Sequence, residues 1–234
     1  MLLFFSGCAI FIGKKQTDSP TSRLPGPGKF SGYYNVSGRI LFKHPDGKHN
    51  GEFTMQISSS SEMRLRVFAP ILGSLIYELR VGPEKFFVLN YQGKNYVLEE
   101  NNLEVRQKWL GMDLSLEELR WLTIGRLPEK TDSWKIEKLS KIEWELTRNS
   151  TNIRIRFNSE GYIASMQKSR EGFQEYKAQI PLYQKANDNI YPKKVQIEDF
   201  TGKNLLMIYL KDLHPFSGSM KKLDFAYPTD LEAL

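Results

Sequence analysis

The sequence of 234 residues is poor in the residue types that most often carry chemistry. Its single cysteine, Cys8, excludes an internal disulfide, and its three histidines, His44, His49 and His214, are too scattered to make a zinc site. No nucleophile elbow, phosphate-binding loop or dinucleotide fingerprint occurs. No apolar run of about 18 or more residues is present, so no membrane-spanning helix is expected. We therefore predict a protein that is not an enzyme and that uses neither a metal nor a cofactor.

The charge is moderately basic. The formal net charge is +6 and the pI is about 9.2, which favours anionic partners. Charged residues alternate with apolar ones and form no long Lys/Arg run, so a solvated basic face is the simpler interpretation. Aromatic residues recur at strand spacing, which indicates core packing and not base stacking, and no nucleic-acid partner is expected. Glu117 and Glu118 fall on a predicted helix, where we expect both carboxylates to be solvated.

The sequence begins with an apolar run that leads into F-S-G-C, in which the cysteine is Cys8. Two small residues followed by cysteine are similar to the lipobox of bacterial lipoproteins, in which the cysteine is lipidated and becomes the mature N-terminus. Seven residues before it are fewer than an ordinary export signal has, and a start codon further upstream would explain this. We expect residues 1–28 to be a signal remnant and flexible tether, because Gly13–Gly28 is rich in Lys, Ser, Thr, Pro and Gly. The alternative is an apolar tail with a chance cysteine.

The segment with the strongest helical pattern runs from Trp109 to Pro128. Ser115-x-x-Glu118 matches a capping box, in which the hydroxyl and the carboxylate each accept a backbone N–H. Gly125 is typical of a helix end. Three leucines recur at helical spacing in between: Leu116, Leu119 and Leu122.

A second short helix is expected from Leu103 to Leu110, ended by Gly111. Each helix has one apolar side, so we expect the pair to lie across a sheet. We expect the leucines at 116, 119 and 122 to face the concave side of that sheet, with Trp109 or Trp121 near its rim.

The rest of the chain is a succession of short alternating segments separated by turn residues. This pattern predicts a mainly-β fold: a curled antiparallel sheet forming an incomplete barrel of about 11–12 strands with a short helical lid. We expect residues 29–234 to form this as one domain. Apolar residues that alternate on one strand face are candidates to line its interior: Leu75, Tyr77, Leu79, Val81, Val195 and Ile197. Whether side chains fill that interior or leave a pocket stays open at this point.

These features together resemble the LolB family of outer-membrane lipoprotein receptors. The resemblance rests on a lipobox-like cysteine, an early β-meander, the apolar turn in Pro70-Ile71-Leu72-Gly73, and the run G-M-D-L-S-L-E-E-L-R-W-L-T-I-G-R-L-P at residues 111–128. Within that run, L-x-W-L-x-x-G-x-x-P at residues 119–128 is the most specific part.

The resemblance implies an incomplete antiparallel barrel covered by a helical lid, with a cavity for the acyl chains of a lipoprotein handed over by a periplasmic carrier. It implies that Leu72 matches a protruding leucine that assists insertion into the outer membrane, with Ile71 beside it. Lipidation, for example by palmitate, would anchor the protein through Cys8 at the periplasmic face of the outer membrane. The lid residues would be Trp109, Leu110, Leu116, Leu119, Trp121 and Leu122.

We therefore expect a monomeric, lipid-anchored receptor that takes lipoproteins from a carrier and inserts them into the outer membrane. Two alternatives stay open. One is a structural or assembly lipoprotein of the outer membrane whose curled sheet is solidly packed, and the other is a carrier of a different lipid. A cavity of several hundred Å³ lined by apolar side chains would favour lipid carriage, whereas a filled interior would favour a structural role.

Overall fold

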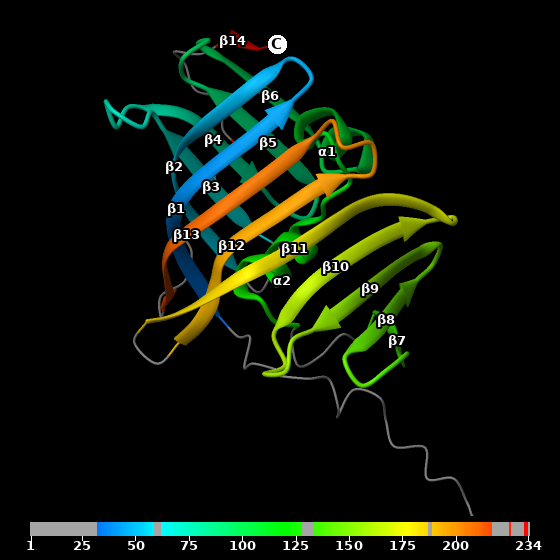
Figure 1. The fold of residues 1–234 in the computed structure, drawn as a ribbon. Helices are drawn as coiled ribbons and strands as arrows, with labels where there is room; N and C mark the ends of the chain where they lie inside the picture. Colours follow the sequence, from blue (N-terminus) through cyan, green and yellow to red (C-terminus); the bar gives the residue numbers. More distant parts are fainter. Residues whose placement is uncertain are drawn as a thin grey trace, which may run out of the picture.

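The computed structural model describes residues 32–58, 62–127, 133–186, 189–216, 225 and 232–233. The tether expected at residues 1–28 and the lipidation site expected at Cys8 lie outside these residues. The described chain folds into one sheet of 14 strands with two short helices (Figure 1).

The strands of the first half are β1 (Tyr33–His44), β2 (Gly47–Ser58), β3 (Met63–Phe68), β4 (Leu75–Val81), β5 (Lys85–Asn90) and β6 (Asn95–Glu100). The helices α1 (Leu103–Leu110) and α2 (Leu116–Ile124) follow. The strands of the second half are β7 (Lys135–Lys138), β8 (Glu143–Arg148), β9 (Thr151–Phe157), β10 (Ile163–Arg170), β11 (Phe173–Ala186), β12 (Asn189–Asp199) and β13 (Leu205–Phe216), and β14 (Glu232–Ala233) comes last.

Two meanders form the sheet, and they meet in its middle. The strand order is β14-β6-β5-β4-β3-β2-β1-β13-β12-β11-β10-β9-β8-β7. The junction is the long antiparallel pairing of β1 with β13, where Tyr33 lies opposite Phe216 and Lys43 opposite Leu205. Because the edges β7 and β14 do not pair with each other, the sheet stays open.

A glycine allows the central pairing to bend. The register of β1 on β13 shifts between Ser37 and Gly38, and a Cβ at Gly38 would lie 2.0 Å from the carbonyl oxygen of Tyr209. Only a residue without a side chain permits this close approach, and a bulge at such a place increases the local bend of a strand. The bend helps the sheet to curve into a trough.

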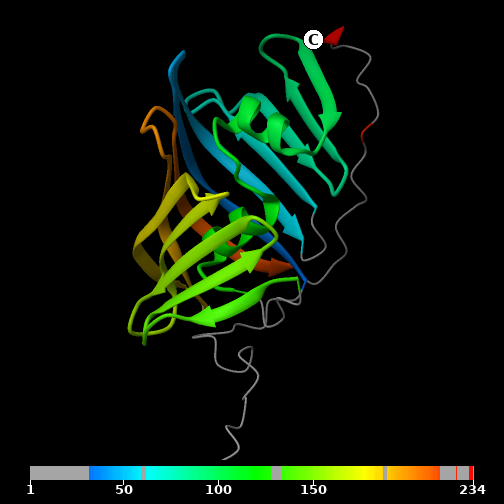
Figure 2. The same ribbon diagram turned by 90° about the vertical axis from the view of Figure 1, so that its right-hand side faces the viewer.

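Both helices lie in the trough between the two halves of the sheet, as Figure 2 shows. Their ends follow local chemistry: Asn102 caps α1 by accepting the backbone N–H of Val105, and Ser115 and Glu118 form the predicted capping box of α2. Gly111 and Gly125 end the helices in the left-handed conformation, with φ of 66° and 74°.

The predicted fold class is confirmed: a curled, mainly-β sheet with a short helical lid. The described residues form 14 strands, more than the expected count of about 11–12. One strand added to the count is β14, whose two residues pair in parallel with Asn95 and Tyr96 of β6. Two residues are too few to show an alternating pattern, so sequence periodicity does not reveal such a strand.

Candidate functional site

The apolar side of the lid is seated on the core of the trough. Trp121 and Leu122 of α2 are fully buried, and Leu119 is buried beside them. Leu116 and, on the first helix, Trp109 and Leu110 are partly buried against the same cluster. All six predicted lid residues therefore lie at the interface between the helices and the sheet.

The predicted lining residues divide into two sets. Val81, Val195 and Ile197 are buried in the core cluster, and Leu79 packs against it. Leu75 and Tyr77, nearer the start of β4, are half-buried. Lid and strand side chains meet directly in one core cluster, so side chains fill this part of the trough.

A buried ionic cluster fastens the lid to the second half of the sheet. The ammonium Nζ of Lys168 on β10 donates to Oδ2 of Asp113 at 2.7 Å and to the Asp113 carbonyl oxygen at 2.8 Å. It also lies 3.0 Å from Oε1 of Glu118. Arg106 of α1 and Arg170 of β10 bind the same Asp113 carboxylate. Asp113 lies in the turn between the helices, so this cluster holds both helices at once.

The cluster keeps the Asp113 carboxylate ionised. Burial alone would raise the pKa of Asp113, but the charges and hydrogen bonds of Lys168 and Arg106 outweigh it and lower that pKa below its ordinary value. The Tyr176 hydroxyl nearby has the opposite shift: burial first, and then Glu118 and Asp113, raise its pKa well above the ordinary range. Tyr176 therefore stays neutral while Asp113 stays charged.

The expectation that both helix carboxylates are solvated is wrong for Glu118. Its side chain is buried because it caps α2 and also binds Lys168. Glu117 stays partly exposed and pairs with Arg148 at 3.3 Å. The signal that could have found Lys168 is alternation, since it follows the buried Met166 by two residues and so faces the same inward side.

The β3–β4 turn places two large aliphatic side chains in solvent. Ile71 is 94% exposed and Leu72 is 84% exposed. The turn is held by its backbone: Ala69 donates to Ser74 at 2.8 Å, and Gly73 donates to Ala69 at 3.0 Å. It projects from the sheet at the left of Figure 1. We call these two neighbouring exposed side chains, on a turn held by backbone hydrogen bonds, the apolar tip of Ile71 and Leu72.

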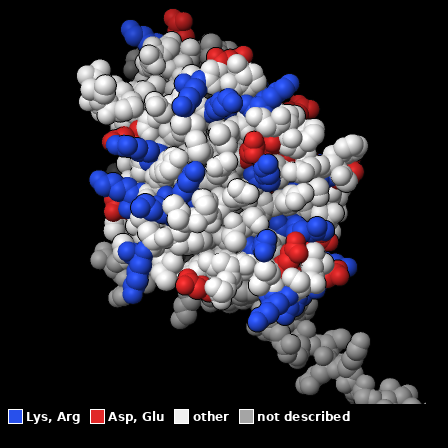
Figure 3. Space-filling view, viewed as in Figure 1, with Lys and Arg blue, Asp and Glu red and all other residues white. Residues whose placement is uncertain are grey.

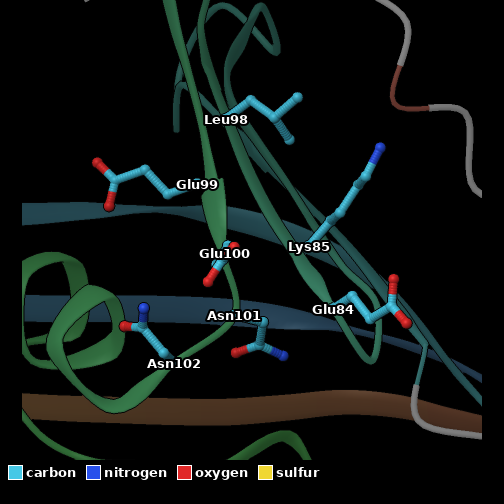
Figure 4. Close-up of a pocket in the computed structure, with 7 residues that line it drawn as sticks. All are labelled: Glu84, Lys85, Leu98, Glu99, Glu100, Asn101 and Asn102. Atoms are coloured by element: carbon cyan, nitrogen blue, oxygen red, sulfur yellow. The ribbon is translucent and has the colours of Figure 1, made fainter.

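A surface pocket of about 560 Å³ lies elsewhere, where β5 and β6 meet the start of α1. Figure 4 shows its lining, which is mostly charged or amide side chains: Glu84, Lys85, Leu98, Glu99, Glu100, Asn101 and Asn102. Such a lining does not suit an acyl chain. Within the described ranges, no group of three or more His, Cys, Asp or Glu side chains could hold a metal ion. Among the same residues, no helix has the length and apolarity needed to cross a membrane.

Comparison with known proteins agrees with this architecture. The family model described as outer membrane lipoprotein LolB matches residues 33–211. No curated protein gives a significant match. A LolA superfamily protein from Nitrosomonas europaea aligns with a TM-score of 0.56 at 10% identity, covering 84% of this chain and 90% of that chain. A DUF1329 family protein from Desulfovibrio piger aligns with a TM-score of 0.56 at 9% identity, covering 81% of this chain and 88% of that chain. At such identities the two structures show a shared fold.

Proposed function

Because this chain belongs to the LolB family of outer membrane lipoproteins, we propose that it is a lipoprotein receptor of that membrane. In this proposal it accepts the acyl chains of a lipoprotein from a periplasmic carrier and inserts the lipoprotein into the outer membrane. The observation that carries the proposal is the apolar tip of Ile71 and Leu72, held in solvent by the backbone of its turn. An exposed aliphatic pair of this kind suits contact with a membrane.

Uptake would use the apolar trough beneath the helices. Each acyl CH₂ group left in water costs about 0.8 kcal/mol, so a carrier must bury the chains of its passenger. Trp121 and Leu122 occupy the trough in the closed arrangement. Acyl chains would displace these two side chains and take over their contacts, which needs no directional chemistry. Release would follow when the lid closes again and restores the packing of α2 on the sheet.

Anchoring would hold the receptor where delivery takes place. We propose that Cys8 is lipidated, that residues 1–28 act as tether, that residues 29–234 fold as one domain, and that this domain works as a monomer at the periplasmic face of the outer membrane. Cys8→Ala should release the protein from the membrane fraction. A variant that fractionates with the membrane as before would contradict the lipid anchor.

The packed trough also fits a second candidate function. The full burial of Trp121 and Leu122 is what a structural or assembly lipoprotein with a filled sheet would show. The two candidates differ in one measurable property, because only the receptor takes up acyl chains.

The deciding experiment separates uptake from delivery. Purified protein is loaded with a labelled triacylated lipopeptide from a donor and then mixed with liposomes. Leu72→Glu should load normally and deliver poorly, because it places a charge where an apolar tip enters the headgroup region. Leu182→Glu is the matched control, since Leu182 is also an exposed leucine, 54% exposed, but lies on β11. No loading by the unsubstituted protein would favour the structural role, and normal delivery by Leu72→Glu would remove this role from the tip.

A further inference from the structure

The hairpin that carries the apolar tip has two chemically different faces. Inward-facing residues of β3 and β4 belong to the core of the trough or pack against it: Met63, Leu65, Leu79 and Val81. The alternate positions face outward, away from the lid, and four of them carry charged side chains: Arg64, Arg66, Glu78 and Arg80. Figure 3 shows Lys and Arg side chains spread over this side of the molecule, some of them along its left edge, with Asp and Glu side chains between them.

Three guanidinium groups converge on one carboxylate there. Nε of Arg64 and Nε of Arg80 lie 2.7 and 2.6 Å from Oε1 of Glu78, and Nε of Arg66 lies 3.2 Å from Oε2. Glu78 is buried beneath them, whereas 30% of the Arg64 side chain and 40% of the Arg66 side chain are exposed. We call Arg64, Arg66 and Arg80 the outer arginine cluster; its two partly exposed members, Arg64 and Arg66, share the single negative charge of Glu78 and so keep a positive excess.

The excess charge is arranged for a further anion. Arg64 lies directly opposite Arg80 across the two strands, and like charges in that position repel each other. The recorded ion pairs of Arg64 and Arg66 use Nε, and Glu78 is their one acidic partner among the described residues. The terminal nitrogens of a guanidinium form a planar fork that matches a phosphate group. Glu78 therefore orients two arginines through Nε, and the side chains of both remain partly exposed.

The outer arginine cluster lies near the apolar tip on the same hairpin. Arg66 precedes Ile71 by five residues of the same hairpin, which is about 15 Å of extended chain. Apolar segments at an interface are buried about 5–10 Å into the headgroup boundary. A tip inserted to that depth leaves Arg66 within about 10 Å of the lipid phosphates, which is about one Debye length at 0.1 M salt, so salt weakens the attraction without removing it.

The geometry points to the outer arginine cluster as a site for lipid phosphate groups, which holds the hairpin against an anionic membrane surface while the apolar tip enters it. This inference rests on the proposed membrane-contacting role of the tip. It adds an electrostatic contribution to membrane binding. The apolar tip supplies insertion, and the cluster supplies attraction and orientation.

The test measures partition of the full chain, carrying Cys8→Ala to remove lipidation, between buffer and vesicles. One set of vesicles is phosphatidylcholine, and the other mixes phosphatidylcholine with phosphatidylglycerol. Arg64→Gln and Arg66→Gln are compared with Arg154→Gln, an outward arginine on β9 that lies 3.5 Å from Glu145. Arg66→Lys keeps the charge without the fork, and the unfolding midpoint of each variant shows whether the hairpin is intact.

Each of the two glutamine variants should bind the phosphatidylglycerol vesicles about fivefold more weakly, the contribution of one basic residue near an anionic surface, with Arg66→Lys in between and Arg154→Gln unchanged. An equal loss in Arg154→Gln would show general charge attraction and would overturn the site, as would unchanged binding by folded Arg64→Gln and Arg66→Gln. Either failure leaves the receptor function standing if Leu72→Glu still loads without delivering. If delivery does not depend on Leu72, that result would instead contradict the proposed function.

Discussion

The ammonium of Lys168 lies 2.7 Å from the carboxylate of Asp113, and both groups are buried. Asp113 belongs to the turn between the two helices, and Lys168 to the tenth strand, so this single contact ties the lid to the sheet. A second bond from Lys168 to the Asp113 carbonyl fixes the backbone of that turn as well. The lid is therefore held by charge as well as by the apolar packing of α2.

Removing the carboxylate of this pair should destabilise the protein strongly. We expect Asp113→Asn to lower the free energy of unfolding by about 3–5 kcal/mol, because it removes the carboxylate shared by Lys168, Arg106 and Arg170 and leaves Glu118 as the one buried carboxylate bound to Lys168. The control is Glu99→Gln, which removes the more exposed ion pair with Lys108 at 2.7 Å and should cost at most about 1 kcal/mol. Urea unfolding of both variants measures the difference, and equal costs would show that the buried pair adds nothing special.

The same carboxylate should make stability depend on pH. The pKa of Asp113 is lowered in the folded protein, so its contribution is fully present above the unfolded value of about 3.9 and is lost as pH falls through the lower folded value. The unfolding free energy should therefore fall with pH below about 4, and the Asp113→Asn variant should show a shallower fall. A parallel pH profile for the two proteins would contradict this assignment.

The helices show how far sequence reasoning reaches. The capping box of Ser115 and Glu118 and the glycine end at Gly125 are local, and the sequence predicts both correctly. The second role of Glu118, its bond to Lys168, joins residues 50 positions apart. That contact depends on how α2 crosses the sheet, which no local pattern specifies.

In the hairpin of β3 and β4, too, the sequence predicts some features and not others. Alternation predicts which of its residues face the trough, because a strand exposes successive side chains on opposite sides. It does not predict that Arg80 and Arg64 stand opposite each other around Glu78, since that register depends on the turn between them and on a shift near Phe68. The apolar tip is visible in the sequence, but its exposure is not, since Ile71 and Leu72 could equally have packed beneath the sheet edge.

The glycine that ends α2 should tolerate no side chain. Gly125 has φ of +74°, and a Cβ there would lie 2.6 Å from the hydroxyl of Tyr183. We expect Gly125→Ala to cost about 2–4 kcal/mol, combining left-handed strain with overpacking. Gly73→Ala is the control: its φ is +62°, but nothing lies within 4 Å, so strain alone should cost about 1–2 kcal/mol. Unfolding midpoints that match for the two variants would show that the Tyr183 contact relaxes.

Truncation of the exposed leucine should cost much less stability than truncation of the buried one. Leu72→Ala should change the free energy of unfolding by no more than about 0.5 kcal/mol, because its side chain is already in water. Leu122→Ala should cost about 2–5 kcal/mol, because it opens a cavity beneath the lid. Thermal or urea unfolding gives both values. A large cost at Leu72 would mean that the turn belongs to the core and is not a tip.

Entry of an acyl chain beneath the lid should be visible at Trp121. This residue is fully buried in the trough. Its ring packs edge-on against that of Trp134, with the ring centroids 5.9 Å apart. In a protein whose other tryptophans are replaced by phenylalanine, a lipopeptide with brominated acyl chains should quench the emission of Trp121, because bromine quenches only at close range. The unbrominated lipopeptide is the control for a change of environment without contact.

The rate of quenching also tests whether the ionic cluster around Asp113 holds the lid on the sheet. In the proposed mechanism an acyl chain reaches Trp121 only after α2 leaves the sheet, and that movement would break the bonds of Lys168 to Asp113 and Glu118. Asp113→Asn should therefore raise the rate of quenching, provided that the variant is folded at the temperature used. If bound lipopeptide leaves the emission of Trp121 unchanged in both proteins, the chains do not enter the trough, and the solidly packed structural lipoprotein becomes the better description.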